Sequence, residues 1–537
     1  MNIVLNFYSN FILMSIPNIL NKESLLDYSI RLSKNYSMLV DYNDRKKFGQ
    51  FFTPRTISVY MSRLFSKISI SKLRILDPCA GIGTLVAALI DTRILKSKMI
   101  KEVSVDLYEL DKKLKPYLQA VMKECSKRLK DVGICFSYNI HISDFIFEKT
   151  LKERKLSNMI DKSSTYNLII MNPPYQKLDK NSVYCKHLKE IIFGKPNLYP
   201  LFIGLCSSLL ESGGELVFIS PRSFCSGIYY KKIRKYLLAK VQIKNIHLFN
   251  SRSIFENVLQ ETIIMKVSNS KSDHRETVIG ISKDESLDDS HNLIVSELDI
   301  IYKKNDSIVI IIPSRKEDLK IIEILNKLPD FLENLEIHAK VGAVVPFRAK
   351  KLVVKESDNL KYPLLWMENL EIDSFSIKWP IENRKEQYIL DDKESNKRLV
   401  PIENYVMIRR FSSKEQNKRI ICSVLLKDNF PSIDKIGIEN HILFLSGLNK
   451  NLEKNLAYGI VGYLSMKIFD VYFRTLNGNT QVNKYELINF PFPNKIKLCK
   501  IGEYVINNNI KKIDKLIEEQ FYQIIGIDIQ FLEMLYD

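Results

Sequence analysis

The tetrapeptide Asn172-Pro173-Pro174-Tyr175 combines residue types that can hold a flat ring carrying an amino group. It follows the apolar run 167–171, which predicts a buried strand. Consecutive prolines keep the backbone extended and remove two N–H donors, so nearby carbonyl oxygens can face a ligand. The Asn172 side-chain oxygen and the Pro173 carbonyl oxygen could then accept both protons of one amino group. This would turn the nitrogen lone pair toward an incoming methyl group and stabilise the developing positive charge, while Tyr175 offers a stacking face.

A second group of candidate residues follows the strand predicted for residues 74–77. Here the sequence reads Asp77-Pro78-Cys79-Ala80-Gly81-Ile82-Gly83, a glycine turn that precedes the helical pattern 85–95. The glycines permit a tight turn close to a ligand, but the third glycine of the dinucleotide-binding fingerprint is missing. A carboxylate at the strand end disfavours a pyrophosphate, whereas it would attract the ammonium and sulfonium groups of S-adenosylmethionine.

Acidic residues also follow the next two predicted strands. The run 103–108 leads to Glu109, at the place where the two hydroxyl groups of a ribose would lie. The run 138–141 leads to Asp144 and Phe145, an acceptor for an adenine amine beside a flat apolar face. Either acidic residue alone could cap a helix or lie in a solvated turn. Because the pattern recurs at three successive strand ends, we interpret it as one cofactor pocket.

The alternation of short β-branched runs with helical patterns predicts a doubly wound α/β sheet. Two further β-rich runs, 242–249 and 261–267, are expected to form a closing hairpin at the edge of this sheet. The polar segment 268–276 predicts the end of the first domain. From about residue 340 onward, short strands and turns indicate a second domain of mixed α+β type.

The composition is that of an ordinary globular protein of more than one domain. The chain has 537 residues, of which 45% are hydrophobic and 26% charged, which excludes wholesale disorder, collagen and coiled coil. Lys and Arg exceed Asp and Glu by 80 to 62, and the net charge of +18 suits a polyanionic partner. No run reaches the roughly 18 apolar residues of a membrane-spanning helix. The 8 cysteines form no Cys-x-x-Cys pair, so we expect a cytoplasmic protein with reduced thiols and no metal site.

Further motifs complete a resemblance to a known family. Residues 47–54 read Lys-Phe-Gly-Gln-Phe-Phe-Thr-Pro, residues 197–202 read Asn-Leu-Tyr-Pro-Leu-Phe, and residues 213–221 read Gly-Gly-Glu-Leu-Val-Phe-Ile-Ser-Pro. With the glycine turn before Asn-Pro-Pro-Tyr, this order resembles the N6-adenine DNA methyltransferases of the gamma class, in which the target-recognition domain comes last. The runs 340–350, 404–415 and 478–483 are similar to PstI/BsuBI-type modification methylases.

The resemblance implies a Rossmann-like methyltransferase sheet with S-adenosyl-L-methionine as cofactor. It implies methyl transfer to N6 of a flipped adenine in duplex DNA, within a type II restriction-modification system. The cofactor-binding residues that it and the strand ends predict are Phe52, Thr53, Asp77, Cys79, Ala80, Gly81, Glu109, Asp144 and Phe145. It assigns catalysis to Asn172, Pro173 and Tyr175, with Tyr175 and Phe255 stacking on the target base. Direct transfer needs no covalent enzyme intermediate, so we expect no catalytic cysteine, metal or buried general base.

The C-terminal half carries the predicted DNA contacts. Residues 405–420 hold five basic residues and one acidic residue, interleaved with aromatic and small polar side chains, which favours contacts to phosphates. The predicted DNA-binding residues are Arg348, Lys350, Arg409, Arg410 and Lys414. We expect double-stranded DNA as the partner, a monomeric enzyme, no membrane contact and a cognate restriction endonuclease that acts separately. The resemblance suggests a short palindrome such as CTGCAG as the recognised site.

We predict four regions along the chain: an N-terminal arm (1–35), a catalytic domain (36–275), a connector (276–335) and a target-recognition domain with a C-terminal helical tail (336–537). Two other functions stay open. Asn-Pro-Pro-Tyr also serves protein glutamine N5-methyltransferases, although those enzymes are short. A non-catalytic DNA-binding specificity subunit is the second alternative, and the intact motif at residues 172–175 argues against it.

Overall fold

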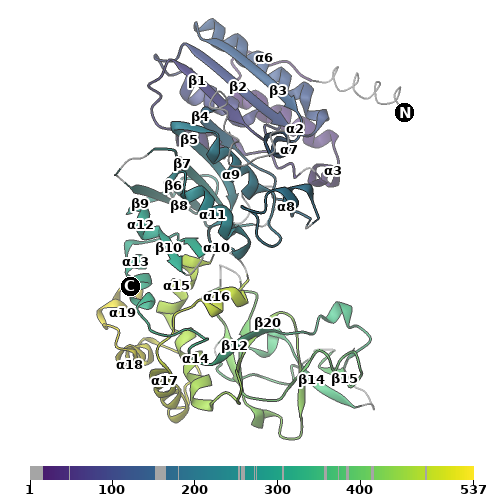
Figure 1. Cartoon of the computed structure of the whole chain (residues 1–537), viewed down its shortest axis with the longest axis vertical. Coiled ribbons are helices and arrows are strands. Elements are labelled where there is room, and N and C mark those ends of the chain that lie inside the picture. The colour runs from purple at the N-terminus through teal and green to yellow at the C-terminus, as the bar shows by residue number, and fades with distance from the viewer. Residues whose placement is uncertain are drawn as a thin grey trace. The chain divides into compact units, whose positions relative to one another are not determined.

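The computed structural model divides the chain into two compact units, Met1–Ser314 and Arg315–Asp537, both drawn in Figure 1. The residues that it describes are 16–47, 49–150, 165–179, 181–251, 254, 260–270, 273, 275–304, 307–355, 360–372, 374–382, 386–412, 416–477 and 481–536.

The first unit is built on a large sheet, which has nine strands in the described part of the chain, in the order β3-β2-β1-β4-β5-β7-β6-β8-β9. The strands are β1 (Lys72–Asp77), β2 (Glu102–Glu109), β3 (Cys135–Ile142), β4 (Tyr166–Met171), β5 (Leu210–Pro221), β6 (Gln242–Phe249), β7 (Thr262–Ser268), β8 (Glu276–Ser282) and β9 (His291–Ser296). Strands β1 to β5 pair in parallel, and β7 runs antiparallel between β5 and β6. The predicted doubly wound sheet is therefore confirmed.

The expected end of the first domain at residue 275 is wrong. Strands β6 and β7 pair as predicted, but β8 pairs in parallel with β6, and β9 pairs with β8, so the hairpin does not close the sheet. The polar segment 268–276 is only the connection between β7 and β8. Within β8, a Cβ on Gly280 would lie 2.5 Å from Nδ1 of the buried His247, so only glycine leaves room for that imidazole. A short hairpin of β10 (Ile301–Lys304) and β11 (Ser307–Ile310) follows in the same unit.

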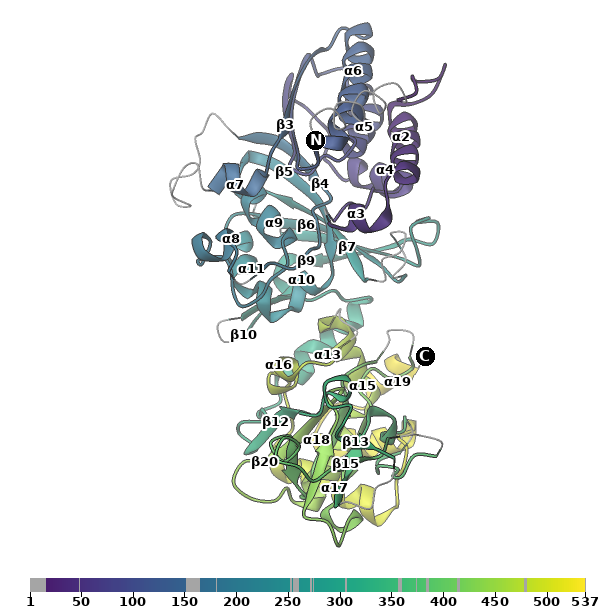
Figure 2. The ribbon, with the colours of Figure 1, turned by 90° about the vertical axis from the view of Figure 1, so that its right-hand side faces the viewer.

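Helices cover both faces of this sheet, as Figure 2 shows. One face carries α2 (Leu25–Leu39), α4 (Arg55–Arg63), α5 (Thr84–Leu89) and α6 (Lys115–Asp131). The other carries α7 (Phe145–Thr150), α8 (Val183–His187), α9 (Tyr199–Ser208) and α11 (Lys231–Leu238). The shorter helices of the unit include α3 (Tyr42–Lys47), a π-helix (Ile90–Ile94), α10 (Ser223–Ser226) and α12 (Glu297–Ile300). The apolar stripes of α2, α4, α5 and α6 form the main core with β1 and β2.

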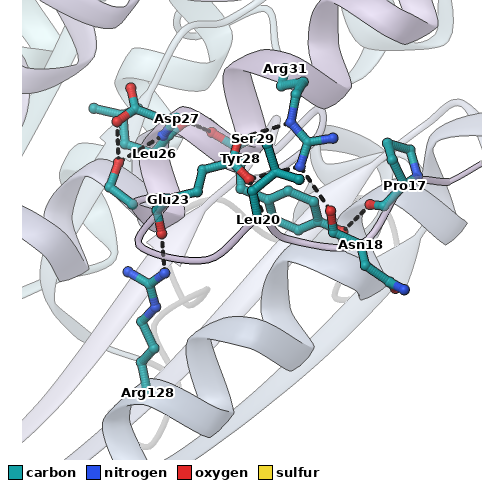
Figure 3. Close-up of polar contacts among 11 residues, drawn as sticks. Pro17, Asn18, Leu20, Glu23, Leu26, Asp27, Tyr28, Ser29, Arg31 and Arg128 are labelled. Atoms are coloured by element: carbon teal, nitrogen blue, oxygen red, sulfur yellow. Dashed lines mark hydrogen bonds and ion pairs between the residues drawn. The ribbon is translucent and has the colours of Figure 1, made fainter.

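The expected N-terminal arm is part of this core from α2 onward. Ser24 caps the helix by accepting a hydrogen bond from the backbone N–H of Asp27, and Leu25 and Leu32 are fully buried. Figure 3 shows how the preceding turn is held. Glu23 pairs with Arg31 at 2.7 Å, and the Arg128 guanidinium of α6 donates to the backbone oxygen of Glu23. Residues 1–15 of the predicted arm lie outside the described residues.

The second unit has the mixed α+β architecture that the sequence predicts. One sheet has the order β12-β20-β17-β18 and the other β13-β15-β14-β19-β16. The strands are β12 (Ile337–Val341), β13 (Val353–Val354), β14 (Lys361–Leu365), β15 (Tyr388–Leu390), β16 (Leu399–Pro401), β17 (Tyr405–Arg409), β18 (Cys422–Leu425), β19 (Lys435–Ile438) and β20 (Ile442–Gly447). The helices are α13 (Lys316–Asn326), α14 (Lys454–Leu464), α15 (Lys467–Leu476), α16 (Lys484–Ile488), α17 (Lys495–Asn507), α18 (Lys515–Ile525) and α19 (Gln530–Tyr536).

The expected connector, residues 276–335, is divided between the two units. Its first part supplies β8 to β11 of the first unit, and α13 belongs to the second. There α13 packs against α15, and the Tyr472 hydroxyl donates to the Asn326 side chain at 3.0 Å. The residues predicted as a connector thus belong to folded elements of the two units.

The described residues contain no helix long and apolar enough to cross a membrane. They also contain no group of three or more His, Cys, Asp and Glu side chains placed to hold a metal ion. All eight cysteines carry free thiols.

Candidate active site

The carboxyl ends of β1, β2, β3 and β4 meet at a cavity of about 250 Å³. This is the edge of a doubly wound sheet at which ligands bind. The lining residues come from the segments that the sequence singled out, and from α8 and α9. They are Gly49, Gln50, Phe51, Phe52, Pro78, Cys79, Gly81, Tyr108, Glu109, Leu110, Leu114, Ser143, Asp144, Phe145, Ile146, Asn172, Pro174, Gln176, Tyr184, Leu198 and Phe202.

The glycine turn after β1 has the backbone conformation that requires glycine. Gly81 and Gly83 have φ of 56° and 88°, in the left-handed region. A Cβ on Gly83 would lie 2.9 Å from Cδ1 of Leu118 in α6, so this position needs glycine for space as well. The turn is joined to the neighbouring strand because the Gly81 N–H donates to Oε2 of Glu109 at 2.9 Å.

Glu109 lies at the end of β2 and presents a carboxylate to the cavity. Its side chain also accepts the Asp111 N–H at 2.8 Å, and the residue is only 9% exposed. Burial raises the pKa of its carboxyl group above the ordinary value. Each carboxylate oxygen can accept two hydrogen bonds, so both oxygens keep an acceptor position for a ligand hydroxyl.

Asp77 is a buried carboxyl group beneath the glycine turn. It is 1% exposed, and its Oδ1 accepts the Cys79 N–H at 3.2 Å. Its Oδ2 has no hydrogen-bond partner among the described residues, and burial raises its pKa to about 8. An unpaired oxygen at this depth is unfavourable unless a cation lies nearby. Asp77 does not itself line the cavity, but its neighbours Pro78 and Cys79 do, so the site fits a cationic ligand such as a sulfonium or ammonium group.

Asp144 and Phe145 line the part of the cavity next to β3. Oδ1 of Asp144 caps α7 by accepting the Phe147 N–H at 2.9 Å, as the helix-cap alternative predicts. Its Oδ2 also accepts from the Tyr184 hydroxyl. Phe145 stacks on Phe202, with ring centroids 5.6 Å apart. Asp144 is therefore both a helix cap and a cavity residue.

Sequence reasoning missed several lining residues of the cavity, among them Tyr184 and Phe202. Tyr184 comes from α8, a helix of five residues without a distinctive pattern. Phe202 lies within the run 197–202, whose resemblance to a family helix motif could have pointed to it.

Asn172 is held in one orientation by the segment before α4. Its Nδ2 donates to the backbone oxygen of Phe51 at 3.0 Å and to Oγ1 of Thr53 at 3.2 Å. Because Nδ2 makes both of these hydrogen bonds, Oδ1 is the acceptor left for a ligand. Gly49 allows this approach, because a Cβ there would lie 2.9 Å from Cβ of Pro174. Thr53 is 5% exposed and does not line the cavity. The resemblance implies that Thr53 contacts the cofactor, whereas in the structure its hydroxyl contacts Asn172.

The other residues predicted for the site do not line the cavity or lie outside the described residues. Pro173 is buried, and Tyr175 packs edge-on against Tyr199 with ring centroids 5.7 Å apart. Neither of them lines the cavity, and nor does Ala80. Phe255, the second predicted stacking residue, lies outside the described residues.

The predicted DNA contacts of the second unit separate into two kinds. Arg348 and Lys350 are exposed. The guanidinium of Arg409 instead donates to the backbone oxygen of Leu370, and that of Arg410 donates to the backbone oxygen of Asn440.

Burial lowers the pKa of Arg409 and Arg410. These two guanidinium groups hold loops of the second unit through backbone oxygens, and their contact with DNA stays a prediction. Lys414 lies outside the described residues.

The strand order and the cavity at the carboxyl ends of the parallel strands are those of a doubly wound, Rossmann-like α/β fold with a ligand site. Residues 57–255 match the Eco57I restriction-modification methylase family. Over 488 residues the chain is 34% identical to the type II methyltransferase M.BsuBI of Bacillus subtilis, covering 89% of this chain and 94% of that protein. It is 32% identical to M.PstI of Providencia stuartii over 504 residues, covering 92% and 97%. The chain belongs to this family of type II modification methyltransferases.

Two solved structures share the fold across both units. The type IIL restriction-modification enzyme MmeI superposes with a TM-score of 0.52 at 12% identity, covering 95% of this chain and 75% of that one. DrdV gives a TM-score of 0.50 at 13% identity, covering 92% and 60%. Family membership makes the protein a DNA methyltransferase with S-adenosyl-L-methionine as its cofactor, which disfavours a glutamine methyltransferase.

The raised pKa of Asp77 predicts a pH dependence of cofactor binding. The carboxyl group is protonated below about pH 8, whereas a bound cation favours the carboxylate, so binding must displace this proton. The affinity for S-adenosylmethionine should therefore rise from pH 6 to pH 8, by up to about ten-fold per unit. Asp77→Asn should bind more weakly with a flatter profile, as calorimetric titrations at several pH values can measure. Identical slopes for both proteins would contradict this role.

Proposed function

We propose that this protein transfers a methyl group to N6 of an adenine in duplex DNA, as the modification enzyme of a type II restriction-modification system. One observation carries the proposal: Nδ2 of Asn172 is hydrogen-bonded to the Phe51 backbone oxygen and the Thr53 hydroxyl, which leaves Oδ1 as the acceptor of a residue that lines the cofactor cavity. The exocyclic amino group of a DNA base has two N–H donors, and Oδ1 of Asn172 and the Pro173 carbonyl oxygen can accept one hydrogen bond each. S-adenosylmethionine bound in the neighbouring cavity would provide the electrophilic methyl group, which it carries on its sulfur atom.

The residues of the site perform the transfer by orientation and electrostatics. Oδ1 of Asn172 and the carbonyl oxygen of Pro173 accept the two amino protons, so the nitrogen lone pair leaves conjugation with the ring and points at the methyl carbon. The same oxygens stabilise the positive charge on nitrogen as the new bond forms. One amino proton is then released to solvent. Glu109 holds the ribose of the cofactor, and Asp77 stabilises its cationic end.

The target adenine must leave the DNA helix to reach Asn172. A base paired within the stack cannot align its amino group with a methyl group inside a cavity, and flipping it costs a few kcal/mol. We assign this cavity to the first unit and DNA recognition to the second, as a catalytic domain and a target-recognition domain. MmeI and DrdV were solved as complexes with DNA, which supports DNA as the partner. A monomeric enzyme, a separate endonuclease and the CTGCAG site stay predictions.

Expression in a host without adenine methylation tests the proposal. DNA from that host should carry N6-methyladenine at one short motif, which sequencing for modified bases detects. Modified cytosine in its place, or unmodified DNA from cells that contain folded protein, would contradict it.

The hydrogen bond from Asn172 to Thr53 should affect turnover more than cofactor binding. Thr53→Val removes the acceptor at 3.2 Å with little change in volume, so the amide loses part of its orientation. A lost neutral hydrogen bond of about 1 kcal/mol predicts a roughly five- to ten-fold lower kcat. The KM for S-adenosylmethionine should stay unchanged, and Thr53→Ser should restore kcat. A rise in KM at constant kcat would instead indicate direct contact with the cofactor.

A further inference from the structure

One face of the second unit carries two adjoining hollows of about 340 and 350 Å³. Both are lined by Pro346, Phe347 and Trp366. Phe347 is 68% exposed, so it presents apolar surface to solvent beside both hollows. Arg348 and Lys350 are exposed on the same turn, so two cationic side chains lie beside this surface, whose lining also includes the exposed carboxylates of Glu368 and Glu386.

The first hollow contains an imidazole held by a buried carboxylate. Nδ1 of His441 lies 2.6 Å from Oε1 of Glu439, whose side chain is only 2% exposed, whereas the His441 side chain is 44% exposed. Burial and the nearby Arg410 lower the pKa of His441, so the ring is neutral near pH 7. Its Nδ1–H then donates to Glu439, and Nε2 is a hydrogen-bond acceptor.

The backbone around this imidazole is fixed from two directions. Arg410 donates to the Asn440 oxygen at 2.7 Å. Gly342 lies against residues 439–442. A Cβ on Gly342 would be 2.1 Å from the backbone oxygen of Glu439, and the Gly342 N–H donates to the backbone oxygen of Ile442 at 2.9 Å. The connection that carries His441 is thus a rigid support.

The opposite side of the hollow supplies a second acceptor. Glu368 is exposed and lines the hollow from the short helix Met367–Asn369. The fully buried Asn369 holds this helix by accepting the Trp366 N–H at 2.6 Å and donating to the Lys378 oxygen at 2.6 Å. Both polar groups that flank the hollow, Nε2 of His441 and the Glu368 carboxylate, therefore accept hydrogen bonds.

We infer that this hollow reads the exocyclic amino group of one cytosine or adenine in the major groove of the recognised DNA site. Cytosine N4 and adenine N6 are the base donors that the major groove presents, and carboxylates recognise them, whereas guanine O6 and thymine O4 are acceptors. Arg348 and Lys350 on the rim can contact the flanking phosphates, which favours DNA over a protein partner. The inference rests on the proposed function and adds to it the residues that set specificity.

The chemistry predicts a particular relaxation of specificity. Replacing cytosine by thymine, or adenine by guanine, exchanges a donor for an acceptor at the same place in the groove. Two protein acceptors repel that substituted base. Removing one of them should let the enzyme accept the substituted site.

The experiment compares Glu368→Ala and His441→Ala with Glu371→Ala. Glu371 is a matched control, because it is an exposed carboxylate three residues away that pairs with Lys378 at 3.6 Å and does not line the hollow. The motif methylated by the wild-type enzyme is found by sequencing. Duplexes that carry each single base substitution are then assayed for kcat/KM.

Glu368→Ala and His441→Ala should each lower discrimination against the cytosine-to-thymine or adenine-to-guanine substitution at one and the same position, by about ten-fold or more. Glu371→Ala should keep the wild-type profile. Unchanged discrimination in both variants, or an equal loss of kcat/KM on every duplex, would overturn the inference. The proposed function would still stand in that case, provided that the wild-type enzyme methylates adenine at a defined motif. A wild-type enzyme without any modified motif would overturn both. If His441→Ala does not fold, the exposed Glu368→Ala decides alone.

Discussion

Replacing Asn172 by alanine should lower methyl transfer to DNA by about 100- to 1000-fold, the usual effect of removing one group that stabilises developing charge. The variant loses Oδ1, one of the two acceptors for the amino protons. The Pro173 carbonyl oxygen remains but cannot hold the lone pair out of conjugation by itself. Cofactor affinity should stay unchanged, because Asp77 and Glu109 are untouched.

The control for this experiment is Asn139→Ala. Asn139 lies on β3 of the same sheet, where its side chain donates to Asp106 at 2.9 Å on the exposed surface. This variant should methylate DNA like the wild-type enzyme. Single-turnover transfer of labelled methyl groups, with cofactor binding measured in parallel, separates chemistry from binding. Near-normal turnover of Asn172→Ala would remove Asn172 from the reaction.

Replacing Glu109 by alanine should weaken S-adenosylmethionine binding by about 100-fold. Each hydrogen bond to a charged group contributes about 1.5–3 kcal/mol, and a ribose offers two hydroxyl groups to this carboxylate. The Gly81 N–H, bonded to Glu109 at 2.9 Å, also loses its acceptor. The glycine turn is then less firmly held, which should lower the melting temperature of the cofactor-free protein as well.

Glu102→Ala is the matched control for Glu109. Glu102 begins the same strand but is only half-buried, and it pairs with Lys72 at 2.9 Å. Its replacement should leave both cofactor affinity and melting temperature nearly unchanged. Calorimetric titration measures the affinity, and equal values for Glu109→Ala and Glu102→Ala would place the ribose elsewhere in the cavity.

The cavity could be predicted from the sequence because parallel strands bring their carboxyl ends together. Asp77, Glu109, Asp144 and Asn172 lie far apart in the chain, but each lies at or just beyond the carboxyl end of a strand of the same parallel set. Strand periodicity therefore carried enough information to collect them at one edge. The left-handed conformation of Gly81 follows from the same turn.

Contacts that depend on tertiary packing could not be predicted in this way. The hydrogen bond from Asn172 to Thr53 joins residues 119 positions apart, and no local pattern specifies it. Arg409 and Arg410 read as exposed cations because charge patterns do not reveal which guanidinium is turned inward onto a backbone oxygen. The polarity of segment 268–276 predicts a boundary, because it gives no sign that β8 pairs with β6 in the same sheet.

The most direct test of the account is the identity of the methylated atom. Purified protein is incubated with duplex DNA and S-adenosylmethionine labelled in its methyl group, and the DNA is then hydrolysed to nucleosides. The label should appear in N6-methyladenine, and Asn172→Ala should abolish it while Asn139→Ala does not. Label in cytosine or in protein, or a yield of N6-methyladenine that does not depend on Asn172, would contradict the account.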